Sequence, residues 1–484
     1  MSKYFAAFGW SFFAFLLILQ TFNNCNGQDI EATITIGEAA PQIAEIQGRF
    51  KNPAGRNFAL LGSYAGIPGL ATRVSDLVLE DARGNSVAYK QFIPGEFVAE
   101  TDVASWRYKM NLRPMENSVL AAHTSWLTSN SGLLFLDDLL PVVPKKKERV
   151  TSKVNLQIPP GWQSRGSTIS QQPVDIDKTV IFLGRSLREI PTATTDAEIK
   201  IVSEGEWKFT DTDIRDFVAE IYREYRDMFG EPPNKRADVF LIHFPQNVGF
   251  GSWEADTRGS TVTVVSSDMA FRTQSIQRLH EQLRHELFHL WLPNAVNLAG
   301  HYDWFYEGFA LYQSLKTGVA LNRLRFEDFL DTLGRAYTFD SAFATRPSLI
   351  DASANRSTGG DADLYARGMI IAFLTDLELM RSSEGKTDID DVLRRLYSKY
   401  HAAEPAVDGN KAVLDLIDSP LITRYVKGTE QIDLSNALKR AGIELIKNGP
   451  SFSFSVTSKP SRRQRELLDR LGYNNWRRSN VSPK

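Results

Sequence analysis

The segment RHELFHLW, residues 284–291, contains the most informative pattern in this sequence. His285 and His289 are four positions apart, so in an α-helix their side chains lie on one face, one above the other. Two imidazole nitrogens placed in this way can reach one Zn²⁺ ion at about 2.0–2.1 Å, with Glu286 beside a water molecule on the metal. A polar patch on an ordinary helix gives the same short pattern, so the surrounding sequence must distinguish the two interpretations.

A catalytic zinc site needs a third protein ligand and keeps its fourth position open for water. The segment HYDWFYEGFALY, residues 301–312, places Glu307 18 positions after His289. A second helix that carries a carboxylate at this separation is the arrangement of the gluzincin metallopeptidases. An acid on a helix surface is the alternative, but the aromatic residues and the glycine around Glu307 favour a metal site.

The composition indicates an ordinary globular protein of two to four domains. The chain has 484 residues, of which 42% are hydrophobic and 24% are charged. Its formal net charge is −2, whereas nucleic-acid binding usually needs a concentrated basic surface. We therefore expect no nucleic-acid partner.

The N-terminus resembles a secretory signal peptide, residues 1–27. Lys3 precedes the apolar run YFAAFGWSFFAFLLILQ, which is shorter than the roughly 20 residues of a membrane span. Cleavage after Gly27 would remove Cys25, the only cysteine, and predicts a secreted or periplasmic protein without a stable membrane span. An uncleaved membrane anchor and lipidation of Cys25 are the alternatives.

The rest of the chain divides into three parts. Residues 30–175 contain short alternating or apolar runs between Pro, Gly and Asn, which predict an N-terminal β domain of the sandwich type. Residues 176–447 contain a helical pattern that begins near 211, then strands at 237–244 and 260–267, and then mainly helices. We expect a mixed β lobe and a helical lobe in this part.

Residues 448–484 form a basic and polar tail, for which we expect a short surface helix with a loose end. The run SFSFSV, residues 451–456, predicts a strand that adds to an existing sheet.

Three blocks of sequence, HELFHLW, WFYEGFALY and DLYARGMIIAFLTDLEL, resemble successive blocks of the glycyl aminopeptidase-type zinc metallopeptidases. These are relatives of aminopeptidase N, and the resemblance extends over residues 30 to 445. It implies a multidomain α+β protein in which a thermolysin-like catalytic domain follows the β domain. It also implies that one Zn²⁺ ion is bound by His285, His289 and Glu307, with Glu286 as the general base. Such proteins often end in a PDZ domain, for which the 38 residues after Ile446 are too few.

The chemistry of this assignment follows from the residues themselves. Zinc lowers the pKa of bound water toward about 7, and the neighbouring carboxylate takes the proton during attack on a peptide carbonyl. A second donor must stabilise the oxyanion. By resemblance to a Y-x-[K/R]-G block, Tyr365 is the candidate, with Arg367 and Gly368 completing the block. Packing of Tyr365 at the start of an apolar helix is the alternative.

An aminopeptidase must also bind the free amine of its peptide substrate. In related families a Gly-rich motif at a strand edge ends in a glutamate with this role, and FGSWEADTRGSTV makes Glu254 the candidate. The match is imperfect, because Trp253 and Ala255 depart from the usual pattern, and a plain loop acid is the alternative. If Glu254 does not bind an amine, an endopeptidase is the competing function, and a non-catalytic binding protein with this fold is the third. The resemblance suggests substrates with N-terminal Gly or Ala.

Five further residues have less distinctive surroundings. We expect His280 to be at the surface or near the metal ligands, His301 to have a loop role, and Asp303 to orient a ligand histidine. Trp291 and Trp304 are expected in the core.

Overall fold

The computed structural model describes the residues 29–38, 42–64, 67–142, 150–166, 173–192, 197–356, 361–417 and 419–475. The predicted signal peptide, with Cys25, lies outside these residues. Among the helices of the described residues, none is both long and apolar enough to cross a membrane.

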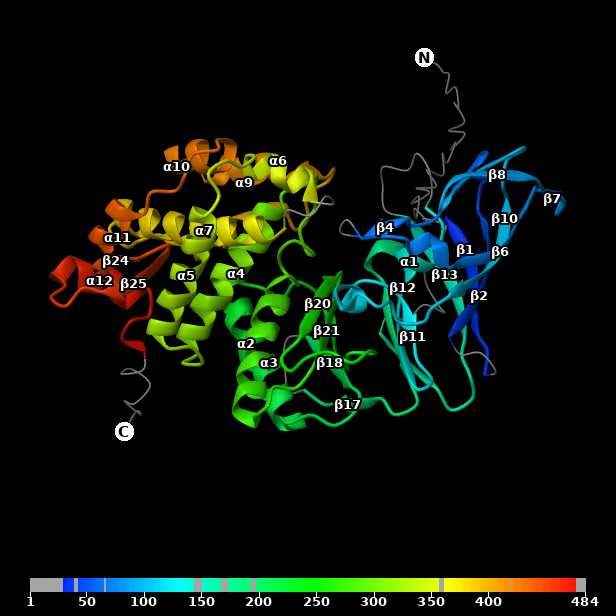
Figure 1. The fold of residues 1–484 in the computed structure, drawn as a ribbon, viewed down its shortest axis with the longest axis horizontal. Coiled ribbons are helices and arrows are strands. Elements are labelled where there is room, and N and C mark those ends of the chain that lie inside the picture. Colours follow the sequence, from blue (N-terminus) through cyan, green and yellow to red (C-terminus); the bar gives the residue numbers. More distant parts are fainter. Residues whose placement is uncertain are drawn as a thin grey trace, which may run out of the picture.

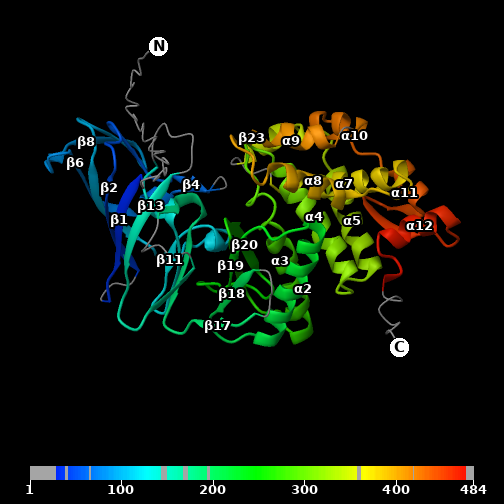
Figure 2. The same cartoon turned by 180° about the vertical axis from the view of Figure 1, so that it is seen from behind.

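The molecule is a mixed α+β structure in which the larger sheets lie toward one end and most helices toward the other (Figure 1). The view from behind shows the same arrangement, with a central sheet between the N-terminal strands and the helices (Figure 2). This central sheet and its two helices, α2 and α3, connect the two ends.

The N-terminal region contains a seven-stranded sheet in the order β15-β13-β1-β2-β10-β6-β7. Its first strand, IEATITI, alternates buried and half-buried residues, because one face of the sheet covers a core. That core is shared with a four-stranded sheet in the order β11-β12-β16-β14. The strands of these two sheets are β1 (Ile30–Ile36), β2 (Ile43–Phe50), β6 (Val74–Glu80), β7 (Ser86–Val87), β10 (Ser105–Asn111), β11 (Trp126–Leu127), β12 (Ser131–Phe135), β13 (Thr151–Gln157), β14 (Gln163–Gly166), β15 (Val174–Asp175) and β16 (Val180–Gly184).

Smaller elements complete this region. They are the sheet β3-β9-β8 (Asn57–Ala59, Glu96–Ala99, Tyr89–Ile93), the pair β4-β5 (Ser63–Tyr64, Ile67–Pro68), the helix α1 (Leu136–Leu139) and the 3₁₀ segments η1 (Leu70–Arg73), η2 (Ser118–Ala122) and η3 (Ile176–Lys178). Strand β16 lies beyond the boundary predicted at residue 175, yet it pairs with β12 and β14. Neither this strand nor its partners were predicted from the sequence, and the division into domains stays a prediction.

The central sheet has five strands in the order β17-β18-β19-β21-β20. Strands β18, β19 and β21 are parallel, whereas β17 and β20 are antiparallel to them at the two edges. Strand β21 is buried at every residue, because one face of the sheet packs on helices and the other on the four-stranded sheet. The strands are β17 (Arg188–Ile190), β18 (Glu198–Ser203), β19 (Arg236–His243), β20 (Trp253–Arg258) and β21 (Thr261–Ser266).

Local sequence explains the limits of the first long helix, α2 (Asp211–Phe229). Thr210 and Asp213 form a reciprocal capping box at its start, and Gly230 ends it with a φ of 93°, a left-handed conformation that favours glycine. The helix predicted to begin near residue 211 is therefore confirmed, and so are the strands predicted at 237–244 and 260–267.

The remaining helices build the C-terminal end of the molecule. They are α3 (Arg272–Phe288), α4 (Asp303–Ala320), α5 (Phe326–Ser341), α6 (Leu349–Ala354), α7 (Asp361–Ser382), α8 (Ile389–Tyr400), α9 (Gly409–Leu416), α10 (Pro420–Ile422), the π segment η5 (Thr423–Lys427), α11 (Ser435–Ala441) and α12 (Arg462–Arg470), with the strand pair β22-β23 (Leu298–Ala299, Val407–Asp408). Trp291 and Trp304 are completely buried among them, which confirms their predicted place in the core.

The C-terminal segment differs in part from the prediction. SFSFSV forms β25 (Ser451–Val456), but among the residues that the structure describes it pairs with β24 (Ile443–Asn448) alone, in a separate hairpin rather than in a larger sheet. Strand β24 lies at the end of a segment that was expected to be helical. A short apolar run is compatible with the periodicity of a helix and with that of a strand, so the sequence did not distinguish them. The hairpin packs on α5, and the predicted surface helix is present as α12.

Candidate metal centre

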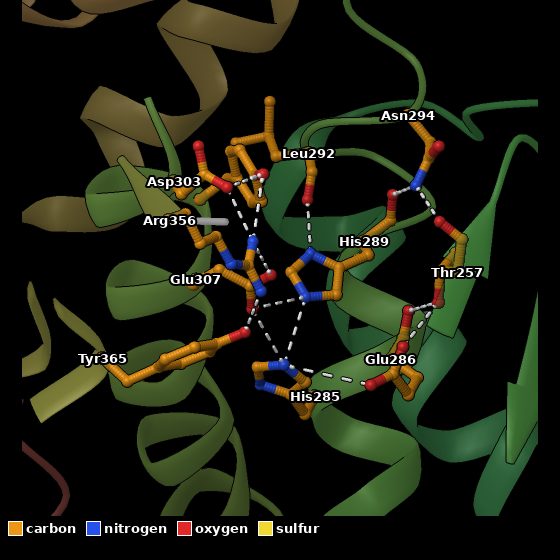
Figure 3. Close-up of polar contacts among 11 residues, drawn as sticks. Thr257, His285, Glu286, His289, Leu292, Asn294, Asp303, Glu307, Arg356 and Tyr365 are labelled. Atoms are coloured by element: carbon orange, nitrogen blue, oxygen red, sulfur yellow. Dashed lines mark hydrogen bonds and ion pairs between the residues drawn. The ribbon is translucent and has the colours of Figure 1, made fainter. Parts of the chain in front are cut away.

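Helices α3 and α4 bring three potential metal ligands together. His285 lies in the last turn of α3, His289 at its C-terminal cap, and Glu307 in the second turn of α4. The two Nε2 atoms are 3.2 Å apart, and Glu307 Oε2 lies 3.4 Å from His285 Nε2 and 3.5 Å from His289 Nε2 (Figure 3). The structure therefore places the three residues as the sequence predicted, with their donor atoms facing one point.

The dimensions of this triangle suit a zinc ion. Ligands about 2.0–2.1 Å from a tetrahedral ion are separated from one another by about 3.3–3.4 Å. The observed separations of 3.2, 3.4 and 3.5 Å match this value, and two imidazoles with one carboxylate are a ligand set that zinc commonly uses. Among the described residues, this trio is the cluster of His, Cys, Asp or Glu side chains that could hold a metal ion.

Further contacts orient His289 for coordination. Its Nδ1 lies 2.9 Å from the carbonyl oxygen of Leu292, so the ring donates its Nδ1–H there and directs the Nε2 lone pair toward the centre. Without a metal ion, burial lowers the pKa of His289, but contact with Glu307 outweighs burial and raises the pKa to about 9. A zinc ion would therefore bind in exchange for the Nε2 proton. The same contacts with His285 and His289 outweigh burial and hold the pKa of Glu307 well below its usual range.

Glu286 lies next to this triangle on α3. Its Oε2 accepts a hydrogen bond of 2.7 Å from the hydroxyl of Thr257 on β20, and its Oε1 faces His285 Nε2 at 3.9 Å. Burial raises the pKa of Glu286, and the two histidines and Thr257 oppose this only in part. The hydrogen bond from Thr257 thus fixes the orientation of the carboxyl group, and the raised pKa makes the carboxylate a stronger proton acceptor than a free one.

Tyr365 approaches the centre from the first turns of α7. Helices α4 and α7 can approach closely because Gly308 and Gly368 face each other, and a Cβ on Gly308 would overlap the backbone of Gly368. Arg367 next to Tyr365 is buried and bonds to Asp340 and to the Tyr425 carbonyl oxygen. Arg367 and Gly368 therefore both have structural roles: the arginine forms these buried bonds, and the glycine allows α4 and α7 to approach closely.

The metal-binding triangle lies in a cavity of about 770 Å³. The edge strand β20 forms another part of the cavity wall, and Glu254 on this strand is half-buried. Burial raises the pKa of Glu254 to about 7, and His123 opposes this shift. The structure thus places Glu254 in the same cavity as His285, Glu286 and His289, as an amine-binding role requires.

The N-terminal region contributes to this end of the cavity. His123 follows η2 and lies 4.0 Å from Glu254 and 3.3 Å from Asp256, measured between nitrogen and oxygen atoms. Its ring stacks on Tyr64, with centroids 5.0 Å apart. Asp256 also accepts a hydrogen bond of 2.7 Å from the buried Arg258, and these two partners outweigh burial and hold its pKa well below the usual range. We call Glu254 and these four residues the amine end.

Several predictions for other residues differ from the structure. His280 is neither at the surface nor beside the metal ligands, because it is buried against Glu220 and Arg284. Asp303 contacts Tyr306 and Arg356 rather than orienting a ligand histidine. His301, in contrast, lies in a loop as expected, and it lines the cavity.

Sequence reasoning also missed residues that contact the site, namely Thr257, His123 and Arg356. Thr257 alone had a usable local signal, since it lies on the same strand as Glu254. The other two reach the cavity from distant segments.

No family model matches the sequence, and no curated protein matches it significantly. Solved structures match it in fold. An aminopeptidase N family protein from Idiomarina loihiensis has a TM-score of 0.70 at 17% identity, over 90% of this chain and 82% of that chain. An M1 zinc metallopeptidase from Deinococcus radiodurans has a TM-score of 0.54 at 15% identity, over 84% of this chain and 95% of that chain. The chain has the fold of the aminopeptidase N family and M1 zinc metallopeptidases.

This M1-type fold agrees with the resemblance predicted from three short sequence blocks. A variant of the Deinococcus radiodurans metallopeptidase was solved with a Tyr-Ser-Ala substrate, and it matches with a TM-score of 0.53 at 15% identity, over 84% of this chain and 94% of that chain. At these identities the likeness concerns the fold, so the chemistry has to be argued from the residues of this chain.

Proposed function

We propose that this protein is a zinc-dependent aminopeptidase with a thermolysin-like catalytic region. The observation that carries the proposal is the triangle of His285, His289 and Glu307, whose donor atoms are 3.2–3.5 Å apart, with Glu286 beside it in a cavity of about 770 Å³. The M1 zinc metallopeptidase fold of similar structures supports a hydrolase.

Zinc, when bound by these three residues, would lower the pKa of a coordinated water toward about 7 and polarise the peptide carbonyl. Glu286 accepts the proton of the attacking water and returns it to the leaving amine, because its Oε1 faces the metal-binding triangle. Thr257 keeps the other carboxyl oxygen in place, so one oxygen of Glu286 remains for proton transfer.

Tyr365 donates its phenolic hydrogen to the oxyanion that develops on the substrate carbonyl. Its side chain lines the same cavity as the three donor residues. An oxyanion donor of this kind typically contributes about 2.7–4 kcal/mol to lowering the barrier.

Glu254 pairs with the α-ammonium group of the substrate and so fixes cleavage after the first residue. Two features support this role: the carboxyl group lies on the edge strand β20 in the cavity, and the N-terminal region lies next to it through His123. An endopeptidase is the second candidate function, because Trp253 and Ala255 beside Glu254 depart from the usual amine-binding pattern.

Metal analysis combined with a peptide panel tests this proposal. We expect about one zinc per chain and much faster hydrolysis of peptides with a free N-terminus than of the same peptides after acetylation. Equal hydrolysis of both sets would favour the endopeptidase. Zinc without hydrolysis of any peptide would favour a binding protein that retains the fold.

A further inference from the structure

Arg356 lies at the edge of the metal centre, in the segment after α6. Its Nη1 is 2.6 Å from Asp303 Oδ1 and 3.5 Å from Glu307 Oε1, and its Nη2 is 2.6 Å from the Tyr365 hydroxyl oxygen (Figure 3). One guanidinium group therefore connects α4, which carries Glu307, with α7, which carries Tyr365.

The direction of the hydrogen bond to Tyr365 is fixed by chemistry. A guanidinium group has donors only, so the Tyr365 oxygen must accept this bond. The phenolic hydrogen is not used in the contact and can be donated to another oxygen. A cationic donor on the phenol oxygen also polarises the O–H bond, which makes the phenol a stronger donor than one bonded to water.

Arg356 is itself held in place. Asp303 lies in the first turn of α4 and is almost completely buried, and it also accepts a hydrogen bond of 2.6 Å from the Tyr306 hydroxyl. Because the Asp303 carboxylate pairs with the guanidinium group, the positive charge of Arg356 is neutralised beside the metal ligands. The Arg356 group lies 5.4 Å from the Tyr365 ring centroid, which limits the orientations of the ring further.

We propose that Arg356 is a positioning residue for Tyr365: anchored on Asp303, it holds the phenol oxygen as an acceptor and thereby presents the phenolic hydrogen to the substrate oxyanion. This inference rests on the proposed peptidase function. Tyr365 remains the residue that touches the reacting carbonyl, and Arg356 acts through it.

A double-mutant cycle tests this role. The variants are Arg356→Gln, Tyr365→Phe and the double variant, with Arg323→Gln as a matched control. Arg323 also forms a paired contact with a carboxylate, that of Glu220, but it does not line the cavity.

We expect Arg356→Gln to lower kcat about 10- to 100-fold in the protein with Tyr365, because a misplaced catalytic group typically costs this much. In the Tyr365→Phe background the same change should lower kcat less than about threefold, since the group that Arg356 positions is gone. KM and zinc content should stay close to those of the control. The unfolding temperature of the metal-free protein should fall equally in both backgrounds, because the buried Asp303 carboxylate loses its charged partner whether or not Tyr365 is present.

Binding of a phosphinic peptide, which has a tetrahedral centre, gives a readout without turnover. Its Kd should rise on Arg356→Gln with Tyr365 present and stay nearly unchanged in the Tyr365→Phe background.

Additive losses in kcat and Kd would overturn the proposal, because they would mean that Arg356 does not act through Tyr365. Loss of zinc in Arg356→Gln would also overturn it, since the arginine would then act on Glu307. Absence of peptide hydrolysis by the wild-type zinc protein would instead refute the proposed function, and this is measured before any variant is made.

Discussion

The two ends of the cavity are built in different ways. At the metal end, His285, Glu286, His289 and Glu307 come from two consecutive helices within 23 residues of sequence. At the amine end, Glu254 on β20 meets His123, which precedes it by 131 residues and belongs to the N-terminal region. The metal end is therefore defined by helical spacing, whereas the amine end exists only when the N-terminal region packs against the central sheet.

The comparison predicts that changes at the metal end affect all peptide substrates, whereas changes at the amine end affect substrates with a free amine. The largest effect is expected for Glu286→Gln. The variant should keep its zinc but lose about 100- to 10,000-fold in kcat on every peptide, because the proton acceptor is removed. Steady-state kinetics and metal analysis check this.

Glu281→Gln on the same helix is the control, because Glu281 is exposed and pairs with Arg278. Near wild-type turnover by Glu286→Gln would remove Glu286 from the mechanism.

The next largest effect is expected for Glu254→Gln. The kcat/KM for peptides with a free amine should fall about 10- to 100-fold, since a hydrogen bond between charged groups contributes about 1.5–3 kcal/mol. Acetylated peptides should be hydrolysed as slowly as by the wild type. Equal losses with both kinds of peptide would mean that Glu254 does not bind the amine.

A smaller, structural effect is expected at the contact between α4 and α7. Gly308→Ala should lower the free energy of unfolding by about 1–3 kcal/mol, because the new methyl group would overlap the backbone of Gly368. Alanine otherwise favours a helix over glycine, so a stabilised protein would contradict this account. Gly37→Ala is the control, since a Cβ there would have no atom within 4 Å, and thermal or denaturant unfolding measures both.

The smallest effect is a pH dependence specific to the amine end. Burial raises the pKa of Glu254 to about 7, so the carboxyl group is ionised and able to pair with an ammonium group only above this pH. His123 is the titratable neighbour that lies 4.0 Å from it, between nitrogen and oxygen atoms. The ratio of kcat/KM for free and acetylated forms of one peptide should therefore fall by about tenfold per unit well below pH 7.

Ionisations at the metal end change the kcat/KM of both peptides by the same factor, so they cancel in this ratio. In the Glu254→Gln variant this ratio should no longer fall at acid pH. If it still falls, a group other than Glu254 is responsible for the pH dependence.

The difference between the two ends also explains what the sequence could predict. The pairing of His285 with His289 follows from spacing in a helix, where residues four apart share a face. Glu307 and the role of Glu286 were predicted from the resemblance to a known family. Tyr365 followed from its resemblance to a short block, although its partner Arg356 carries no local signal because it lies in an irregular segment. His123 and Thr257 reach the site through contacts between segments far apart in sequence, which no periodicity reveals.

The fold shows the same limit. The alternation in IEATITI and the capping residues of α2 predict local elements correctly. The pairing of β16 with β12, and the change from helix to strand at β24, depend on partners supplied by the tertiary structure.

Anomalous diffraction at the zinc absorption edge, from crystals of the wild-type protein, tests the central claim most directly. We expect one strong peak at about 2.0–2.1 Å from His285 Nε2, His289 Nε2 and a carboxylate oxygen of Glu307. A crystal with zinc supplied that shows no peak there, or a peak on other ligands, would contradict the account.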